Sequence, residues 1–201
     1  MLIYGASGHG KELANLARLV GYTVDSFVDD ALIGPFVLSH EEASRRYPDV
    51  PVLLGAGYPQ VRRKMASKSG CFLKRLIHPR VELADSIKIG EGSVIQAGSV
   101  LTVNIQIGEH THINIGSTVS HDVYIGDFVT LSPGVHLCGN VHIESDVFVG
   151  AGVVIMNGTP KDPIVIGRGS TIGAGACVTS SVPAGETWVG VPAAPIRRRN
   201  S

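Results

Sequence analysis

Aliphatic residues recur at every sixth position from residue 77 onward, and this spacing dominates the pattern of apolar and polar positions in the chain. The series runs without a gap through Ile77, Leu83, Ile89, Ile95, Leu101, Ile107, Ile113, Val119, Ile125, Leu131, Leu137, Ile143, Val149 and Ile155. A second series of small or β-branched residues follows four positions later, from Val81 to Val153. A period of six fits neither an α-helix nor a hairpin sheet. It predicts a parallel β-helix built from hexapeptides.

In such a β-helix each hexapeptide supplies one short strand and one corner, and its first and fifth residues point into a narrow prism. Three sides make one coil of about 18 residues, so residues one coil apart stack about 4.8 Å apart. The spacing breaks once, because eleven positions separate Ile155 from Ile166. We expect residues 157–163 to leave the prism there as a loop, and such loops often line a binding face. The apolar series then resumes at Ile166, Ile172, Val178 and Ala184.

The first 75 residues follow a different pattern, in which short apolar strands alternate with amphipathic helices. The expected strands are residues 2–4, 23–28, 51–54 and 72–76, and the expected helices are 11–20, a short one capped by Ser39 and Glu42, and 58–67. This alternation predicts βαβ units and a parallel sheet, one Rossmann-like half of a doubly wound fold. We therefore divide the chain into an α/β domain at 1–76 and a β-helix domain with a C-terminal tail at 77–201. No flexible linker separates them, which predicts a fixed angle between the two.

Three loops of the first domain are expected to meet at one edge of its sheet, where the strands end. The segment Gly5–Gly10 joins a strand to a helix, and its backbone N–H groups could hold a phosphate with help from the helix dipole. Its spacing is GxxGxG, neither the dinucleotide GxGxxG nor a Walker motif, so alone it is a weak signal. Asp29 and Asp30 follow the second strand, where carboxylates commonly meet ribose hydroxyls, and Gly55 follows the third. Together the loops favour nucleotide binding over a set of ordinary turns.

His121 is the strongest candidate for a catalytic group in the repeats. It lies two positions after Val119, so it points outward, and the residue one coil later is Gly139. An imidazole beneath a residue without a side chain leaves room for a thioester, with His121 as general base and the Gly139 N–H as oxyanion donor. Asp122 could tune the basicity of this imidazole, although neighbours along a strand usually face apart. The alternative is a surface histidine like most others in the repeats.

The composition limits which partners and which cellular compartment we expect for the protein. Lysine plus arginine and aspartate plus glutamate number 17 each, so we expect neither a nucleic-acid partner nor a membrane. The one run of like charge, Arg197-Arg198-Arg199, is expected to be a solvated tail. The three cysteines are widely spaced and form no CxxC pair, which predicts reduced thiols. With no long apolar stretch and no signal-peptide pattern, we expect a cytoplasmic protein.

Several large apolar residues fall on outward positions of the repeats. They are Val103, Ile115, Phe128, Phe148, Val154 and Met156. Single exposed apolar residues are ordinary, but several on one rod favour a surface for self-association.

Several features occur together in one family. They are the segment Ile3–Gly10, the pair Asp29-Asp30, Ile77-His78-Pro79, the hexapeptides, His121 with an acidic neighbour, Gly139-Asn140-Val141, and Gly190-Val191-Pro192-Ala193. In this order and combination the chain resembles the bacterial sugar acyltransferases typified by PglD and NeuD over almost its whole length. Hexapeptides alone would indicate only the wider superfamily of β-helix acyltransferases.

The resemblance implies a left-handed β-helix and a homotrimer with active sites between neighbouring prisms. It implies direct transfer of acetyl from acetyl-CoA, without a metal, to the 4-amino group of a UDP-linked amino-sugar. His121 would be the general base, Asp122 would raise its basicity and the Gly139 N–H would bind the oxyanion. An acyl-enzyme at Cys138 is disfavoured, because no neighbour is expected to lower the pKa of that thiol.

The same resemblance assigns the binding residues. The phosphates of the nucleotide-sugar would be held by Ser7, Gly8 and His9, the uridine by Asp29 and Asp30, and Gly55 would border that pocket. The CoA groove would be lined by Ala151 and Ala174. Thr130 stands where close relatives carry a second histidine near the acetyl group, and its hydroxyl could donate the same hydrogen bond.

Three other functions are compatible with parts of the pattern. A γ-type carbonic anhydrase also uses a β-helix trimer but needs a zinc site of three histidines, two of them five residues apart, and no pair here has that spacing. A non-catalytic nucleotide-sugar binding protein would not need His121. A NeuD-like O-acetyltransferase would acylate a sugar hydroxyl, which the sequence does not separate from an amine acceptor.

Overall fold

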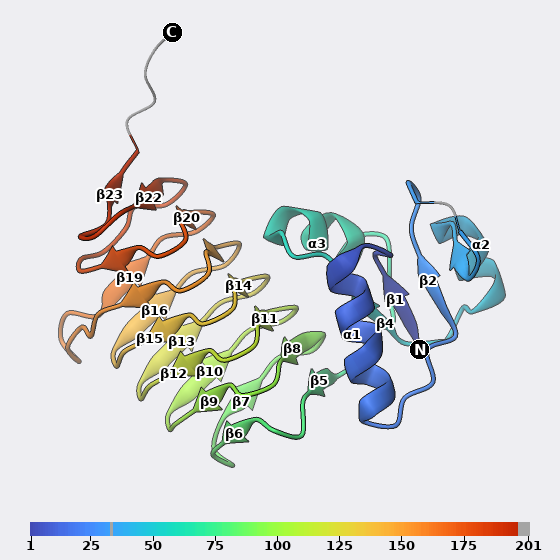
Figure 1. The fold of residues 1–201 in the computed structure, drawn as a ribbon, viewed down its shortest axis with the longest axis horizontal. Coiled ribbons are helices and arrows are strands. Elements are labelled where there is room, and N and C mark those ends of the chain that lie inside the picture. The colour runs from blue at the N-terminus through green and yellow to red at the C-terminus, as the bar shows by residue number, and fades with distance from the viewer. Residues whose placement is uncertain (33, 197–201) are drawn as a thin grey trace, which may run out of the picture.

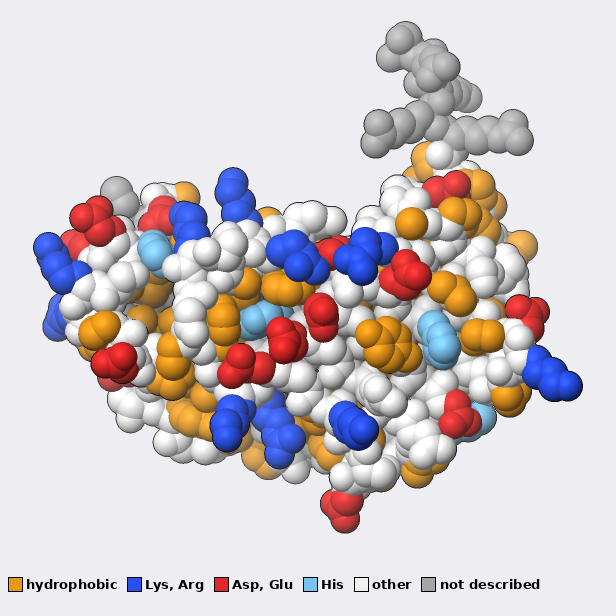
Figure 2. Space-filling view, turned by 180° about the vertical axis from the view of Figure 1, so that it is seen from behind, with side chains coloured by type: hydrophobic (Ala, Val, Ile, Leu, Met, Phe, Trp, Pro, Cys, Tyr) orange, Lys and Arg blue, Asp and Glu red, His pale blue; other side chains and the backbone are white. Residues whose placement is uncertain are grey.

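A computed structural model describes residues 1–32 and 34–196, so the arginine run at 197–199 lies outside the described residues. The chain forms a small α/β domain followed by a long three-sided prism (Figure 1). Cys71, Cys138 and Cys177 are all free thiols. Within the described ranges, no helix has the length and apolarity needed to cross a membrane. Figure 2 shows basic and acidic side chains interspersed on one side of the molecule, in keeping with the balanced composition.

The α/β domain is built on a four-stranded parallel sheet in the order β3-β2-β1-β4. Its strands are β1 (Leu2–Tyr4), β2 (Ser26–Val28), β3 (Val37–Leu38) and β4 (Val52–Leu54), and its helices are α1 (Gly8–Leu19), α2 (His40–Arg46) and α3 (Pro59–Ala66). The apolar side of α1 packs on one face of the sheet, and Ala43 of α2 belongs to the core on the other. The expected capping box of Ser39 and Glu42 is present at the start of α2.

The prism has three parallel sheets, here called faces 1, 2 and 3. Face 1 contains β5 (Arg75–Ile77), β8 (Ser93–Ile95), β11 (His112–Ile113), β14 (Thr130–Leu131), β17 (Phe148–Val149), β20 (Thr171–Ile172), β22 (Thr187–Val189) and β23 (Ala194–Pro195). Face 2 contains β6 (Glu82–Leu83), β9 (Val100–Leu101), β12 (Thr118–Val119), β15 (His136–Leu137), β18 (Val154–Ile155) and β21 (Cys177–Val178). Face 3 contains β7 (Lys88–Ile89), β10 (Ile105–Ile107), β13 (Val123–Ile125), β16 (Val141–Ile143) and β19 (Ile164–Ile166). All pairs are parallel except β22 with β23.

The expected register and interior are confirmed. Val119 pairs with Leu137 and Ile107 with Ile125, so each coil takes 18 residues. Both apolar series fill the core of the prism. The polar members of the second series are also satisfied there, because the hydroxyls of Ser93 and Thr111 donate to the carbonyls of Gly108 and Gly126.

The interruption of the repeat is where the sequence predicts it, and the final coil differs from the prediction. His142 pairs with Val165, so five extra residues leave the ladder between β18 and β19. In the last coil Val182, not Ala184, is the buried residue, and Val182 bridges to Ile166. The final turn is therefore two residues shorter than a regular coil, and the expected inward position of Ala184 is wrong.

The α/β domain packs on face 1, and this contact corrects two further expectations. Residues 72–76 do not complete the small sheet: only Phe72 bridges to Val52, whereas Arg75–Ile77 pairs with β8 as the first strand of the prism. Phe128 is buried in the core of the α/β domain and Phe148 stacks on Tyr58. These two rings are covered within the chain, while Val103, Ile115 and Met156 remain exposed.

Candidate active site

His121 and Gly139 meet at the corner that joins face 2 to face 3, here called the His121 corner. The His121 side chain is 56% exposed. A Cβ atom built on Gly139 would lie 2.5 Å from Cε1 and 2.7 Å from Nε2 of that imidazole, so the ring occupies the space that any larger residue at position 139 would need. The Gly139 N–H donates to no acceptor among the described residues. An imidazole and a free backbone donor therefore share one small notch on the outer wall of the prism.

Asp122 contacts the imidazole because the chain turns between the two residues. Asp122 has φ +58°, so the strand-like alternation of side chains does not apply. Its carboxylate lies 2.8 Å from His121 Nδ1 and accepts a second hydrogen bond from the Asn104 amide. The hydrogen bonds from His121 and Asn104 lower the pKa of the Asp122 carboxyl, which is therefore ionised at neutral pH. An ionised partner makes Nδ1 the protonated nitrogen and leaves the Nε2 lone pair free to accept a proton.

Replacing Gly139 with alanine tests this notch. The added Cβ would overlap the imidazole, which must then rotate away from the free N–H. We expect G139A to lower the rate of the expected acyl transfer by about 10²–10⁴-fold, the contribution of a positioned general base, because the imidazole is displaced while the backbone N–H remains. The matched control is G134A at another corner, where a Cβ would meet no atom within 4 Å, although its φ of +67° costs some stability. Thermal melts would separate that cost from catalysis, and equal rates for G139A and wild type would contradict the assignment.

The loop that is expected to bind phosphate forms an open helix N-terminus. α1 begins at Gly8, three residues earlier than expected, and the Ser7 side chain makes no capping hydrogen bond. The N–H groups of residues 7–10 have no acceptor within the described part of the chain, and they point out of the helix end. Gly55 packs against this loop, because a Cβ there would lie 2.9 Å from the Gly10 Cα atom. The structure thus brings Ser7, Gly8 and Gly55 together at the sheet edge.

Asp29 and Asp30 lie at the same edge, but both carboxylates already bind groups of the chain. Asp29 accepts backbone hydrogen bonds from Ala6, Ala31 and Leu32. Burial alone would raise the pKa of Asp29, but these three donors outweigh it and lower the pKa. Asp30 accepts from the Lys68 ammonium and the backbone of His40, which lower its pKa to about 2. Both acids therefore order the loops around the candidate nucleotide site.

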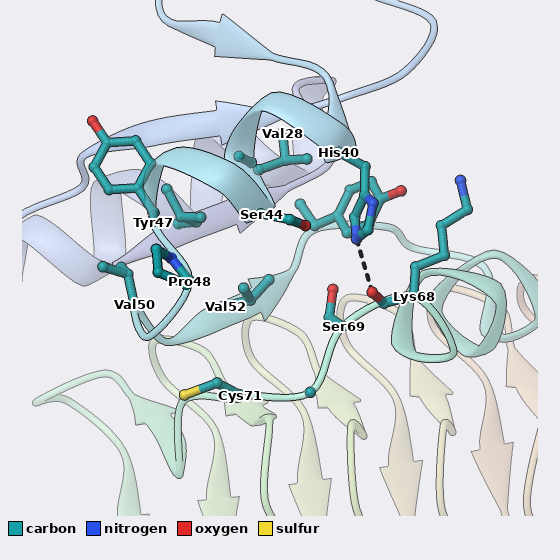
Figure 3. Close-up of a pocket in the computed structure, with 14 residues that line it drawn as sticks. Val28, His40, Ser44, Tyr47, Pro48, Val50, Val52, Lys68, Ser69 and Cys71 are labelled. Atoms are coloured by element: carbon teal, nitrogen blue, oxygen red, sulfur yellow. Dashed lines mark hydrogen bonds between the residues drawn. The ribbon is translucent and has the colours of Figure 1, made fainter.

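Two residues that complete this edge, Tyr4 and Lys68, were not predicted from the sequence. Tyr4 donates to Asp30, and Lys68 forms the ion pair described above. With Asp29, Asp30, Lys64 and Met65 they line a cavity of about 190 Å³. A second cavity, of about 170 Å³, lies between α2 and residues 68–71, and Figure 3 shows the His40 side chain reaching the Lys68 carbonyl at its mouth. None of the catalytic or binding residues predicted from the sequence lines that second cavity.

His9 points toward the prism. Its Nε2 lies 2.9 Å from Nδ1 of His112, and its Nδ1 lies 3.2 Å from Glu12. Burial lowers the pKa of His9, and it lowers that of the fully enclosed His112 much further. Both rings are therefore neutral at neutral pH. With its proton on Nδ1, toward Glu12, His9 accepts at Nε2 a hydrogen bond from the Nδ1–H of His112. His9 is held as part of the contact between the α/β domain and face 1.

The remaining predicted residues lie on other parts of the prism. Thr130 is 2% exposed on face 1, and its hydroxyl donates to the Gly57 carbonyl at 2.7 Å. Ala151 and Ala174 are exposed at the corner between faces 1 and 2, which the β17–β18 and β20–β21 turns form. The α/β domain covers face 1, and face 1 lies opposite the His121 corner. A single chain therefore does not bring the candidate base and the candidate nucleotide loops together.

A metal site is not formed by the described side chains. Within residues 1–32 and 34–196 no group of three or more His, Cys, Asp or Glu residues is arranged to hold a metal ion. The three-histidine zinc site of a γ-type carbonic anhydrase is therefore not found in that part of the chain.

Comparisons with known proteins match both halves of the molecule. The PglD N-terminal domain matches residues 1–69, and the hexapeptide repeat of succinyl-transferase matches residues 80–103 and 140–180. The structure of WeeI from Acinetobacter baumannii AYE is 40% identical, with a TM-score of 0.91 and coverage of 97% of this chain and 98% of that one. The acetyltransferase domain of PglB from Neisseria gonorrhoeae FA1090 in complex with acetyl coenzyme A is 31% identical, with a TM-score of 0.88 and coverage of 97% and 98%.

Further relatives cover the chain to different extents. PerB from Caulobacter crescentus, in complex with CoA and GDP-perosamine, is 29% identical, with a TM-score of 0.88. The match covers 98% of this chain and 96% of that one. A UDP-3-O-acylglucosamine N-acyltransferase from Caulobacter sp. is 60% identical over 37 residues, which are 18% of this chain and only 11% of that protein. The expected Rossmann-like half domain and left-handed β-helix are confirmed. The chain belongs to the PglD-type family of sugar acyltransferases.

Proposed function

We propose that this protein transfers an acetyl group from acetyl-CoA to the 4-amino group of a UDP-linked amino-sugar, with His121 as the general base. The observation that carries the proposal is the notch at the His121 corner, where a free Nε2 and a free Gly139 N–H lie side by side. The free N–H groups at the start of α1 support a phosphate-bearing acceptor. Family membership supports the class of reaction, and the complexes of PglB and PerB support the donor and a nucleotide-linked sugar.

In this mechanism the sugar amine attacks the thioester carbonyl carbon directly. His121 Nε2 accepts the proton that the amine nitrogen loses as the C–N bond forms. The Gly139 N–H donates a hydrogen bond to the oxygen, which carries negative charge in the tetrahedral intermediate. The C–S bond then breaks, and CoA leaves as the thiol after taking up the proton. Asp122 keeps the imidazole in the required tautomer and orientation throughout.

We propose that the protein forms a trimer, because the candidate base and the candidate nucleotide loops lie on opposite sides of a single chain. The α/β domain covers face 1, and the His121 corner points away from it. A neighbouring copy that brings its nucleotide loops against this corner would complete the site. Exposed Val103 and Ile115, at two corners of the prism, are apolar surface for such a contact.

A thiol-release assay tests the acceptor. Acetyl-CoA would be offered with UDP-, dTDP- and GDP-linked 4-amino-sugars, and with matched sugars that carry a hydroxyl at the same carbon. We expect turnover with a UDP-linked amine and at least a hundredfold lower kcat/KM for the hydroxyl analogue, because a hydroxyl needs more help from the base. Faster reaction of the hydroxyl sugar would establish O-acetylation instead. No turnover with any member, despite binding of the nucleotide-sugar, would favour a binding protein.

A further inference from the structure

Three residues with left-handed backbone conformation stack at the His121 corner, one on each successive coil. They are Asn104, Asp122 and Asn140, with φ angles of +55°, +58° and +56°. Asparagine and aspartate are among the few residues other than glycine that adopt this conformation readily, so the backbone alone explains these residue types. The Asp122 N–H donates to the Val103 carbonyl at 3.2 Å, which holds the Asn104 and Asp122 corners in register. Their side chains therefore project from equivalent positions one coil apart.

The Asp122 carboxylate is held at both of its oxygens. Its Oδ1 atom accepts from the Asn104 amide nitrogen at 3.1 Å, and its Oδ2 atom lies 2.8 Å from His121 Nδ1. An ionised carboxylate can only accept, so the Asn104 amide must present its NH₂ group and the imidazole its Nδ1–H. The Asp122 side chain is 48% exposed, so water competes with the imidazole for its oxygens. Of the two contacts, only the one from Asn104 can hold the carboxylate in place for the imidazole.

We infer that Asn104 is a positioning residue for the proposed base, an inference that rests on the function proposed above. Its amide holds one oxygen of Asp122, so that the other oxygen faces His121 Nδ1 and keeps the proton on that nitrogen. Nε2 then keeps its lone pair for the proton of the sugar amine. Without the amide, the exposed carboxylate can rotate away, and the ring is free to take its other tautomer. Within the described part of the chain the Asn104 side chain donates to Asp122 and not to the imidazole, so it acts through that carboxylate.

Replacing Asn104 with glycine separates the amide from the backbone requirement, because glycine adopts a positive φ without strain. We expect N104G to lower kcat for acetyl transfer about three- to tenfold, the effect of losing one hydrogen bond. The KM for acetyl-CoA should change little, because the amide acts on the base alone. N104D keeps a residue type that tolerates this conformation but sets a second carboxylate against Asp122, so it should cost more than N104G.

A double-mutant cycle shows whether the amide acts through Asp122. D122G removes the carboxylate and, like N104G, introduces a residue that suits the positive φ of its corner. In the D122G background we expect N104G to cause no further loss of kcat, because residues that act through one contact do not contribute independently. Equal losses in both backgrounds would mean that Asn104 only stabilises the corner, and would overturn the inference.

The tautomer of His121 gives a readout that does not depend on transfer. Nitrogen-15 NMR of histidine-labelled protein, at a pH where the ring is neutral, distinguishes protonation at Nδ1 from protonation at Nε2, and H121A assigns the signal. We expect Nδ1–H to predominate in the wild type and N104G to shift the ratio toward Nε2–H. That shift, in a protein whose wild type acetylates no acceptor, would support this inference and contradict the proposed function. An unchanged ratio in N104G would overturn the inference, whatever the rate.

Discussion

Replacing His121 with alanine is expected to lower kcat for acetyl transfer by at least about a hundredfold, within the range that a positioned general base contributes. The Nε2 lone pair would be lost, while the Gly139 N–H and the surrounding coils remain in place. The KM for acetyl-CoA should change little, because in the proposed mechanism the imidazole acts on the amine and not on the donor. Thiol release at saturating acceptor measures kcat, and the comparison is best made at several pH values.

Two companion variants show whether the loss belongs to the base. H142A removes another exposed histidine of the prism, one that contacts the Tyr124 ring, and should leave kcat within a factor of two. D122N keeps the shape of the carboxylate but not its charge, and should cost less than H121A because Nε2 is still present. A rate for H121A within tenfold of wild type would mean that some other group accepts the proton.

The β-helix could be read from the sequence because its contacts repeat at a fixed interval. Once the period is six, Val119 must meet Leu137, and His121 must lie beneath Gly139. The same arithmetic located the insertion between Ile155 and Ile166. It failed at Ala184, where the final turn is shorter and Val182 takes the buried position, because the ends of a solenoid do not have to repeat.

The contact between the two domains could not be read in this way, since it joins residues that no period connects. Phe128 and Phe148 occupy outward positions that resemble an assembly surface, yet the α/β domain covers them. The roles of Asp29 and Asp30 show the same limit. Their position after β2 predicted ligand contacts, whereas the structure shows that both carboxylates bind neighbouring loops.

Arg62 makes hydrogen bonds to both domains at this contact, and no pattern in the sequence indicated that role. It lies on α3, and its side chain is completely buried. Burial lowers the pKa of its guanidinium to about 9, which still leaves it charged at neutral pH. The charge faces five backbone carbonyls, those of Ala56, Gly57, His110, Phe128 and Val129, at 2.8–3.0 Å.

We expect R62A to lower the free energy of unfolding by about 3–5 kcal/mol, the cost of removing one side of a buried charged network. Lysine should not rescue it, because an ammonium has three donors and no planar fork with which to reach both domains. K64A is the matched control: Lys64 lies on the same helix and is exposed, so its removal should cost less than about 1 kcal/mol. Denaturant unfolding followed by circular dichroism measures both.

The same variant connects the domain contact to the proposed reaction. Three of the five carbonyls belong to the prism and two to the loop after β4, so Arg62 fixes the α/β domain on face 1. At temperatures where R62A is still folded, we expect KM for the nucleotide-sugar to rise several-fold while KM for acetyl-CoA is unchanged, because the residues expected to bind the donor all belong to the prism. Equal changes in both constants would mean that the α/β domain does not position the acceptor, and that Arg62 only stabilises the fold.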